Sequence, residues 1–447
     1  MSRALPSILL TDLYQLVMAQ TYFELDMHET AVFELFTRRL PPQRRFLIAA
    51  GLEQALEYLE RLRFTTEDIA YLSGLGTFTP RFLDHLLTVR FTGAVHAMPE
   101  GTPCFADEPI LRITAPILES QLIESRILNI CHFQTLIASK AARVLLAAQG
   151  RRLVDFGMRR AHEADAALFA ARAAYLAGFD ATATVEAGRT FGIPLAGTLA
   201  HSFIEAHDLE IDAFRNFVRS SASATTLLLD TYDTERATRR LLRLLEELRG
   251  TPQRVQGVRI DSGDLGAEAS RVRSLLDAAG HGEIQIIASG GLDEHAIEQL
   301  VAAGAPIDAF GVGTALDAAT DAPALDMAYK LEWYAGKARR KRSSGKATWP
   351  GAKQVHRVRD AQGVLLRDRI VLAEEQDPGE ALLQPVLRQG RRLTPAASLP
   401  AMREYARREI LTLPMQLRQL APGGEPHPVS VSSALQALAV SLDRNDA

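Results

Sequence analysis

The chain of 447 residues is poor in cysteine and has no long apolar run. Its two cysteines, Cys104 and Cys131, exclude a disulfide framework and a zinc cluster built on cysteine. No stretch reaches the ~20 unbroken apolar residues that a membrane-spanning helix needs. Asp12 interrupts the short apolar stretch near the N-terminus, and no small-residue cleavage site follows it. We therefore expect a soluble, cytoplasmic protein.

The sequence also lacks an excess of charge of one sign. A formal net charge of -4 at pH 7 gives no electrostatic footprint for nucleic acid or an anionic membrane. The basic run Arg339–Arg342 is short and has no interleaved aromatic residues. A chain of this length exceeds the ~150 residues of one ordinary domain. We expect two or three domains, with neither nucleic acid nor membrane as a partner.

The N-terminal flank begins with a helical pattern and continues with a strand. Residues 8–25 predict an amphipathic helix that Thr11 or Asp12 can cap, with Tyr14 in its first turn. Without further information, Tyr14 is a core side chain. Residues 30–36 alternate as a strand does, and Arg38 follows at its end. Arg38 either binds an anion or faces solvent.

Turn-rich β sequence lies on both sides of the middle of the chain. Residues 91–113 and 354–372 contain short apolar runs cut by glycine, proline or a hairpin turn. Residues 118–148 predict a long helix that is broken near His132, with a domain boundary in or near it. Because the two β-rich stretches flank the middle, we expect them to build one domain together.

The middle of the chain has a regular rhythm. Helical patterns at 234–248, 267–279 and 295–303 alternate with apolar runs that end in glycine or a polar residue. These ends are Asp155–Gly157, Gly197–Thr198, Leu229–Asp230, Arg259–Asp261, Ser289–Gly291 and Gly311–Gly313. From Leu195 onward the spacing is near the ~30 residues of a βαβ unit. The rhythm predicts a parallel barrel or a doubly wound sheet.

One of these runs ends in a histidine. Residues 193–200 predict a strand that leads into His201, after which a helical pattern begins with Ser202 as its expected N-cap. A helix N-terminus beside a histidine at a strand end favours a phosphate ligand. The alternative is a buried histidine whose hydrogen bonds are satisfied within the core.

Other ends carry glycines, carboxylates and an aromatic ring. The glycine pairs at 290–291 and 311–313 favour a phosphate site on the last loops of a barrel. Asp261, two residues after Arg259, can hold sugar hydroxyls or Mg²⁺, unless it or Ser262 only caps the next helix. Asp230 has the same two possible roles. With Phe156 beside two arginines, these ends predict a site for a phosphorylated sugar and a flat, anionic partner.

An ordered set of motifs resembles one family. DFGMRRAHE, GTLAHSFIEAH, LLLDTYDT, GVRIDSGDL, IIASGGLDE and FGVGTAL are closely similar to nicotinate phosphoribosyltransferases, as are TDLYQLVMAQ, FELFTRRLP and KATWPGAKQVHR. The resemblance runs from about Thr11 to Arg357. It implies the type II phosphoribosyltransferase fold: an irregular TIM-like α/β barrel and an α/β sandwich domain built from N- and C-terminal segments. We place these at 137–335 for the barrel, and at 1–136 and 336–447 for the sandwich, with a polar tail.

The resemblance also implies a reaction. The family makes nicotinate mononucleotide and pyrophosphate from nicotinate and phosphoribosyl pyrophosphate, in NAD salvage. ATP is a co-substrate hydrolysed through a phosphohistidine, and Mg²⁺ is held mainly by pyrophosphate. A homodimer with shared active sites is implied as well.

Residue roles carry over position by position. His201 matches the phosphorylated histidine, and Phe156 the residue that stacks on the pyridine ring. Tyr14 matches the ring on the other face, supplied by the partner subunit, and Arg38 a cross-subunit arginine, although Arg39 leaves the register open. The residues expected around the ribose phosphate and the reacting centre are Arg159, Asp230, Arg259 and Asp261, and those expected to bind the 5′-phosphate are Ser289, Gly290, Gly291, Gly311 and Gly313.

Two alternatives stay open. Nicotinamide phosphoribosyltransferases have an aspartate in a Thr-Asp-Thr-Val stretch, where this chain has Ala183. The nearby Asp180 keeps that alternative open. The other is a non-catalytic sensor of phosphorylated sugars, against which the presence of His201, Arg259 and Asp261 argues.

Overall fold

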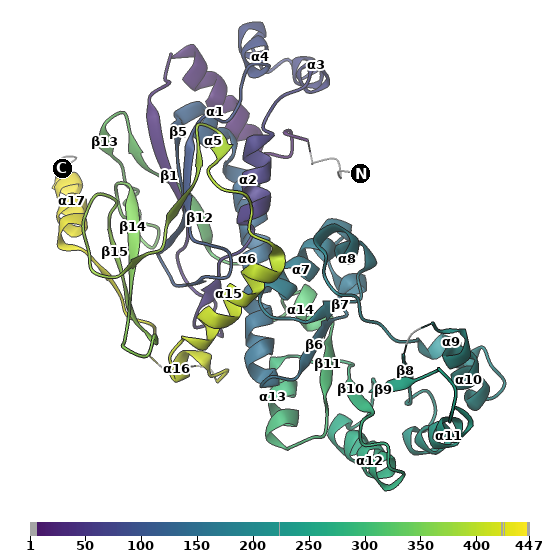
Figure 1. Ribbon diagram of the computed structural model, residues 1–447. Coiled ribbons are helices and arrows are strands. Elements are labelled where there is room, and N and C mark those ends of the chain that lie inside the picture. Colours follow the sequence, from purple (N-terminus) through teal and green to yellow (C-terminus); the bar gives the residue numbers. More distant parts are fainter. Residues whose placement is uncertain (1–6, 223, 422, 424, 445–447) are drawn as a thin grey trace. The chain divides into compact units, whose positions relative to one another are not determined.

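The computed structural model describes residues 7–222, 224–421, 423 and 425–444, which form two compact units (Figure 1). The first joins Met1–Ser139 to Ala324–Ala447, and the second is Lys140–Pro323. Among the described residues, no helix has both the length and the apolar character required to cross a bilayer.

A seven-stranded sheet dominates the first unit. Within it, β1 (Thr30–Thr37) pairs antiparallel with β5 (Pro109–Pro116) on one side and β12 (Met327–Tyr334) on the other. Beyond them lie β13 (Lys337–Ala338), β3 (Ala94–Ala97), β17 (Gln384–Arg388) and β18 (Arg391–Arg392), in the order β13-β12-β1-β5-β3-β17-β18. N- and C-terminal segments therefore share one sheet. β12, which the expected boundary at residue 335 assigned to the barrel, belongs to this sheet.

A smaller sheet completes the strands of this unit, with order β16-β14-β15-β19. β14 (Lys353–Arg359) and β15 (Leu365–Leu372) form the predicted hairpin, whose turn is held by Asp360. The outer strands of this sheet are β16 (Glu380–Ala381) and β19 (Val429–Val431). A separate two-stranded sheet is formed by β2 (Leu47–Ile48) and β4 (Pro103–Cys104).

The first helix of this unit ends next to its predicted end at residue 25 but begins at Leu13 instead of residue 8. α1 (Leu13–Glu24) starts after Asp12, whose capping box with Gln15 identifies it as the N-cap. The others are α2 (Leu52–Glu60), α3 (Thr66–Gly74), α4 (Pro80–Leu86), α5 (Ile117–Leu122), α15 (Leu399–Leu411), α16 (Met415–Arg418) and α17 (Ser433–Arg444). The helix expected at 118–148 is interrupted at Ile123, between α5 and α6 (Glu124–Ala148), so the predicted break near His132 is wrong. His132 lies within α6, and its side-chain Nε2 accepts a hydrogen bond from the Leu325 amide at 2.8 Å.

The second unit contains a parallel sheet of six strands in the order β7-β6-β11-β10-β9-β8. They are β6 (Arg152–Asp155), β7 (Ala181–Thr182), β8 (Thr225–Leu228), β9 (Val255–Ile260), β10 (Gln285–Ala288) and β11 (Ala309–Val312). The strands follow the order of the chain around the sheet, and the last, β11, returns to pair with the first, β6. This is the predicted barrel arrangement, realised as a parallel half-barrel.

The strand expected at 193–200 is reduced to a single bridge between Leu195 and Thr182. Among the described residues no backbone ladder joins this segment to β8, so the ring is open there, and we call this gap the seam. Ser202 is not an N-cap, because the extended residue before α9 (His201–Glu205) is Ala200. The prediction of a Ser202 cap is therefore wrong.

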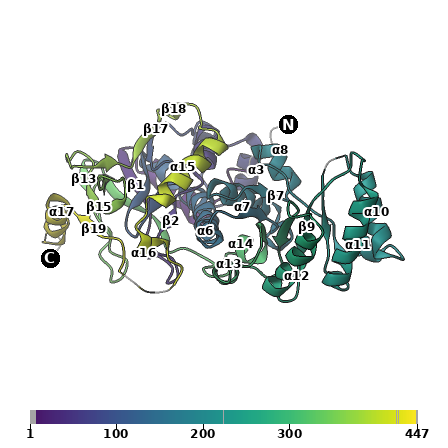
Figure 2. The same cartoon turned by 60° about the horizontal axis from the view of Figure 1, so that its bottom comes forward.

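Helices cover the outside of this sheet. α12 (Leu265–Ala278) packs against β9 and β10, and α10 (Glu210–Ser220), α11 (Thr234–Glu247) and α12 lie next to one another (Figure 2). The others are α7 (Ala164–Leu176), α8 (Val185–Phe191), α13 (Glu294–Ala302), α14 (Thr314–Asp317) and the 3₁₀ helix η1 (Met158–Arg160). Strand side chains such as Val258, Ile260, Ile286 and Phe310 are completely buried and form the core.

Candidate active site

Arg259, near the end of β9, joins three strand ends of the second unit. Its Nε donates to Ser289 Oγ at 2.8 Å, and its Nη1 donates to Thr198 Oγ1 at 2.7 Å. Its Nη2 lies 2.8 Å from Asp261 Oδ1. Because these partners follow different strands, the guanidinium fixes the relative positions of the loops that carry them.

Asp261 is a charged carboxylate in this cluster. Burial opposes its ionisation, but hydrogen bonds from Ser289 and Arg259 outweigh burial and lower its pKa. The alternative role as a helix cap falls to Asp264, which accepts from the Ala267 amide at 3.1 Å at the start of α12. The carboxylate of Asp261 therefore stays at the strand end, 26% exposed.

His201 faces this carboxylate. Its Nε2 lies 3.8 Å from Asp261 Oδ2, and its Nδ1 lies 3.1 Å from the Thr231 hydroxyl. The side chain is 39% exposed, so the alternative of a fully buried core histidine is wrong. One ring nitrogen remains available toward solvent and ligands, whichever tautomer the Thr231 contact selects.

Asp230 follows β8 and retains unused hydrogen-bonding capacity. Its Oδ2 accepts from Ser262 Oγ at 2.6 Å. Its Oδ1 is buried and has no partner among the described residues. A buried carboxylate oxygen without a donor is costly, and a bound cation, hydroxyl or water would satisfy it.

The glycines of the last two strand ends permit close backbone approaches. Gly290 has φ +91°, and a Cβ there would stand 1.8 Å from the Asp261 carbonyl oxygen. A Cβ on Gly311 would stand 2.4 Å from ring atoms of Phe156. Gly291 also has positive φ, and Gly313 approaches the Phe156 backbone. The loops at Gly290, Gly291 and Gly313 thus present their amides without a covering side chain of their own, whereas Gly311 is buried within β11.

Phe156 and Arg159 follow β6. The Phe156 ring packs on Gly311, and the Arg259 guanidinium carbon lies 5.7 Å from the ring centroid. Arg159, in η1, is exposed and makes no hydrogen bond or ion pair with any described residue. The structure thus brings Phe156 into the cluster and leaves Arg159 free beside it in sequence.

Tyr14 and Arg38 lie in the first unit. Tyr14 is 47% exposed in the first turn of α1, so core packing is not its role. Arg38 is 14% exposed and pairs with Asp326 at 3.0 Å, so it does not simply face solvent.

Asp180 forms hydrogen bonds with the backbone of Leu153. Its amide donates to the Leu153 carbonyl, and its Oδ2 accepts from the Leu153 amide at 2.9 Å. The carboxylate therefore binds the backbone of β6, whereas Ala183 follows the end of β7. Asp180 does not replace the aspartate that is absent at Ala183.

Sequence reasoning missed the hydroxyls that orient the charged groups. Thr198 and Ser289 bind Arg259, Thr231 binds His201, and Ser262 binds Asp230. Ser289 had been expected only as a phosphate-binding residue. All of them lie within three residues of a recognised strand end or of His201, and this adjacency could have identified them.

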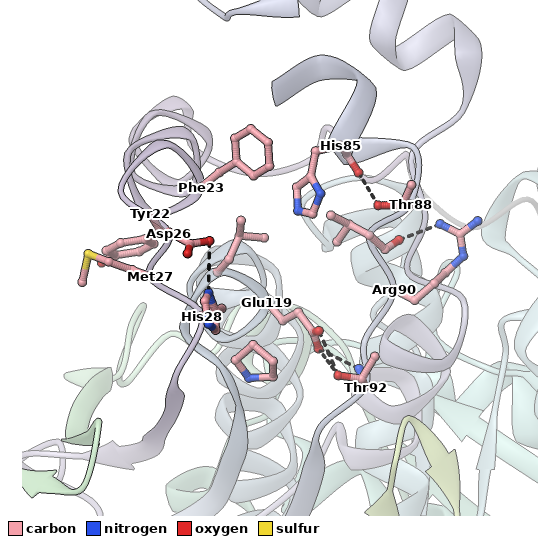
Figure 3. A pocket seen from close by; sticks show the side chains of 13 residues that line it. Tyr22, Phe23, Asp26, Met27, His28, His85, Thr88, Arg90, Thr92 and Glu119 are labelled. Carbon is pink, nitrogen blue, oxygen red and sulfur yellow. Dashed lines mark hydrogen bonds and ion pairs between the residues drawn. The ribbon is translucent and has the colours of Figure 1, made fainter. Parts of the chain in front are cut away.

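A cavity of about 500 Å³ lies in the first unit, lined by no predicted site residue (Figure 3). The rings of Phe23 and His85 stack at 4.5 Å, and Glu119 accepts hydrogen bonds from Thr92. None of the residues that line this cavity has a buried polar atom without a partner in the described part of the chain. The cavity therefore defines no ligand chemistry.

Comparisons with known proteins agree with the geometry of the second unit. Residues 9–132 match the nicotinate phosphoribosyltransferase (NAPRTase) N-terminal domain, and residues 151–362 match the nicotinate phosphoribosyltransferase (NAPRTase) family. The chain is 50% identical to nicotinate phosphoribosyltransferase pncB2 of Mycobacterium tuberculosis over 428 residues, which are 96% of this chain and 92% of the relative. It is 44% identical to nicotinate phosphoribosyltransferase of Bacillus subtilis over 356 residues, 78% of this chain and 72% of the relative. The crystal structure of human nicotinic acid phosphoribosyltransferase superposes with a TM-score of 0.86 at 29% identity, covering 97% of this chain and 100% of that one.

Proposed function

The chain belongs to the nicotinate phosphoribosyltransferase family and has that activity, and from this premise we propose that ATP hydrolysis drives the transfer through phosphorylation of His201. The observation that carries the proposal is the position of His201 Nε2, 3.8 Å from the carboxylate of Asp261, at the end of the strand that also holds Arg259. A phosphoryl acceptor thus lies beside the groups assigned to the transfer.

In the transfer, the nicotinate ring nitrogen bonds to the anomeric carbon as the carbon–pyrophosphate bond breaks. Positive charge develops on the ribose and negative charge on the leaving group. In this proposal Asp261 stabilises the first, and Arg259 and Arg159 stabilise the second. Phe156 stacks on the pyridine ring, and the amides at Gly290, Gly291, Gly311 and Gly313 hold the 5′-phosphate, with Ser289 orienting Arg259.

The residues fit a magnesium ion that is carried mainly by the substrate. The described residues contain no cluster of three or more potential metal ligands, so the chain does not form a complete cage. The partnerless Oδ1 of Asp230 and the exposed part of Asp261 offer hard oxygen ligands. When bound, Mg²⁺ would neutralise charge on the pyrophosphate.

The coupling step is nucleophilic. With Nδ1–H donating to Thr231, the lone pair lies on His201 Nε2. This nitrogen bonds to the γ-phosphorus of ATP while the bond to the β,γ-bridging oxygen breaks, releasing ADP. Water later cleaves the phosphorus–nitrogen bond and yields phosphate and free histidine. The free energy of this hydrolysis favours product.

Replacing His201 separates coupling from transfer. His201→Ala should abolish ATP hydrolysis and its stimulation of the reaction, while a slow transfer that is independent of ATP survives. Product formation is followed with and without ATP and Mg²⁺, beside trapping of labelled phosphate on the native protein. His207→Ala is the matched control because His207 contacts the Phe203 carbonyl. ATP hydrolysis in step with product by the His201 variant would exclude His201 and direct attention to His207.

We also propose a homodimer with shared sites. α1 exposes the apolar side chains of Leu13, Tyr14 and Val17, and Leu10, which precedes the N-cap, is exposed as well. In the dimer, Tyr14 covers the second face of nicotinate in the partner's site, and the ion pair with Asp326 orients Arg38. Sedimentation should give a dimer, and a fully active monomer would exclude shared sites.

Nicotinate is the proposed pyridine substrate in preference to nicotinamide. Ala183 offers no carboxylate to hold an amide or repel an acid, and Asp180 is occupied by the Leu153 backbone. Measured side by side with phosphoribosyl pyrophosphate and Mg²⁺, nicotinamide should turn over far more slowly. Equal kcat/KM for the two would overturn this preference.

A further inference from the structure

Two buried carboxyl groups adjoin the turn that carries Phe156, and the reaction described above uses neither. Asp155 ends β6 and is 1% exposed, and Asp317 ends α14 and is 2% exposed. Asp317 packs directly on the turn, because a Cβ on Gly157 would stand 2.2 Å from its carboxyl carbon. Only glycine fits between the two acids.

Asp155 holds the turn from the strand side. Its Oδ1 accepts from the Gly157 amide at 2.8 Å, and its Oδ2 accepts from the Thr182 hydroxyl at 2.7 Å. Phe156 lies between these anchors, with its amide donating to the Val312 carbonyl at 2.8 Å. The direction of the Phe156 ring therefore depends on the position of the Asp155 carboxylate.

Asp317 has no other partner to stabilise a negative charge. Both of its oxygens are buried, and neither accepts a hydrogen bond from an N–H or O–H group of the described residues. The Asp155 carboxylate adjoins the same residue, because it accepts from the amide of Gly157, against which Asp317 packs. Two adjacent buried carboxyls cannot both be ionised at low cost, so one of them keeps a proton.

The surroundings assign that proton to Asp317. Burial also raises the pKa of Asp155, but two donors stabilise its charged form, whereas burial and the Asp155 charge raise the pKa of Asp317 to about 9. α14 packs on η1 and α7, whose charged side chains are Arg159, Arg160, Asp165 and Arg172. Burial and Asp155, not these four, are the causes of the shift.

We propose that Asp317 is a positioning residue: it remains a neutral carboxylic acid, donates its hydrogen to Asp155, and so fixes the turn that directs Phe156 toward nicotinate. This inference rests on the proposed stacking of nicotinate on Phe156. Asp317 touches no substrate and acts through Asp155. It also joins the end of β6 to the loop after Gly313, on which the proposed phosphate cradle depends.

The protonation state is tested by counting protons released on unfolding. An unfolded aspartate, with a pKa of about 3.9, is ionised at neutral pH, so unfolding the native protein must release the proton held by Asp317. From about pH 5 to about pH 8, the native protein should release about one proton more than Asp317→Asn. The slopes of unfolding free energy against pH give this difference. Equal release by the two proteins would overturn the proposal, because Asp317 would then be charged in the fold.

Positioning is tested by steady-state kinetics with the same variants. An amide still donates to Asp155, so Asp317→Asn should retain most of the affinity for nicotinate. Asp317→Leu fills similar space without a donor and should raise KM for nicotinate about tenfold, with a much smaller change in KM for phosphoribosyl pyrophosphate. In the native protein KM for nicotinate should rise above about pH 9, and in Asp317→Asn it should not. Equal rises in both KM values for Asp317→Leu, or no alkaline rise in the native protein, would contradict the positioning role.

A third variant distinguishes this inference from the function on which it rests. If Phe156→Ala leaves KM for nicotinate unchanged, the stacking assignment fails while the proton count for Asp317 can still hold. If Phe156→Ala raises that KM and Asp317→Leu does not, stacking stands and the positioning role of Asp317 fails.

Discussion

Two clusters of charged side chains, one in each unit, differ in how fully their charges are paired. In the first, Arg357 binds Asp368 through two hydrogen bonds of 3.0 and 2.7 Å, with side chains 1% and 0% exposed. In the second, Asp261 and His201 stay partly exposed, and one oxygen of Asp230 has no partner in the described chain. A charged side chain that is fully paired within the protein stabilises the fold. A charged side chain with an unpaired or exposed atom can bind a ligand.

The pairing of Arg357 with Asp368 shifts the pKa values of both side chains. Burial opposes ionisation of Asp368, but His427, whose Nε2 lies 3.6 Å away, and two hydrogen bonds from Arg357 outweigh it and lower its pKa to about 2. The Asp368 charge in turn outweighs burial and raises the pKa of Arg357. Each partner depends on the other to remain charged in the core.

The largest effect on stability is expected from removing one partner of the buried Arg357–Asp368 pair. Arg357→Met should cost about 3–5 kcal/mol of unfolding free energy, because Asp368 would be left buried without its counter-ion. The matched double variant Arg357→Met with Asp368→Leu should recover much of that loss. Denaturant unfolding measures both. A single variant as stable as the native protein would show that the buried pair does not hold the unit together.

Replacing the partly exposed Asp261 should instead affect the reaction more than stability. Asp261→Asn should raise the transfer barrier by about 1–3 kcal/mol, because it removes a negative charge next to the developing positive one. Unfolding free energy should change far less than for Arg357→Met, since the amide can still accept from Arg259 or Ser289. Single-turnover transfer and denaturant unfolding are compared on one preparation. A stability loss as large as that of Arg357→Met, with transfer intact, would reverse the assignment of roles.

An exposed ion pair should have the smallest effect on unfolding free energy, and it serves as the reference for the two variants above. Arg239 and Glu235 lie one turn apart on α11, 2.8 Å from each other and 59% and 49% exposed. Arg239→Ala should cost at most about 0.5 kcal/mol of unfolding free energy and leave kcat unchanged. A larger loss in either measurement would mean that exposed charge matters here for reasons other than pairing.

The strand ends were predictable because local rules fix them. A parallel strand that meets a helix through a tight loop needs glycine or a capping acid, and Gly290, Gly311 and Asp264 are such residues. The approximate position of the His201, Arg259 and Asp261 cluster follows once those ends share one edge of a sheet.

What could not be predicted depends on partners far apart in sequence. The pairing of β12 with β1 moved a segment out of the expected barrel, and nothing in residues 327–334 alone distinguishes the two sheets. Asp155 and Asp317 each look like an ordinary loop acid. Their shared proton follows only from burial side by side. The helix break at Ile123 likewise carries no glycine or proline to announce it.

The seam between the Leu195 segment and β8 has a mechanical consequence. Elsewhere the ring is held by peptide ladders, whose spacing is fixed at about 4.8 Å by backbone geometry. At the seam, described side chains cross the gap instead: Arg259, from β9, reaches Thr198, and His201 reaches Thr231. Each such bond contributes about 0.5–1.5 kcal/mol net, so rotamer changes can alter the circumference there at little cost. One of the side chains that bridge the seam is the His201 imidazole, the group that the proposed phosphorylation would modify.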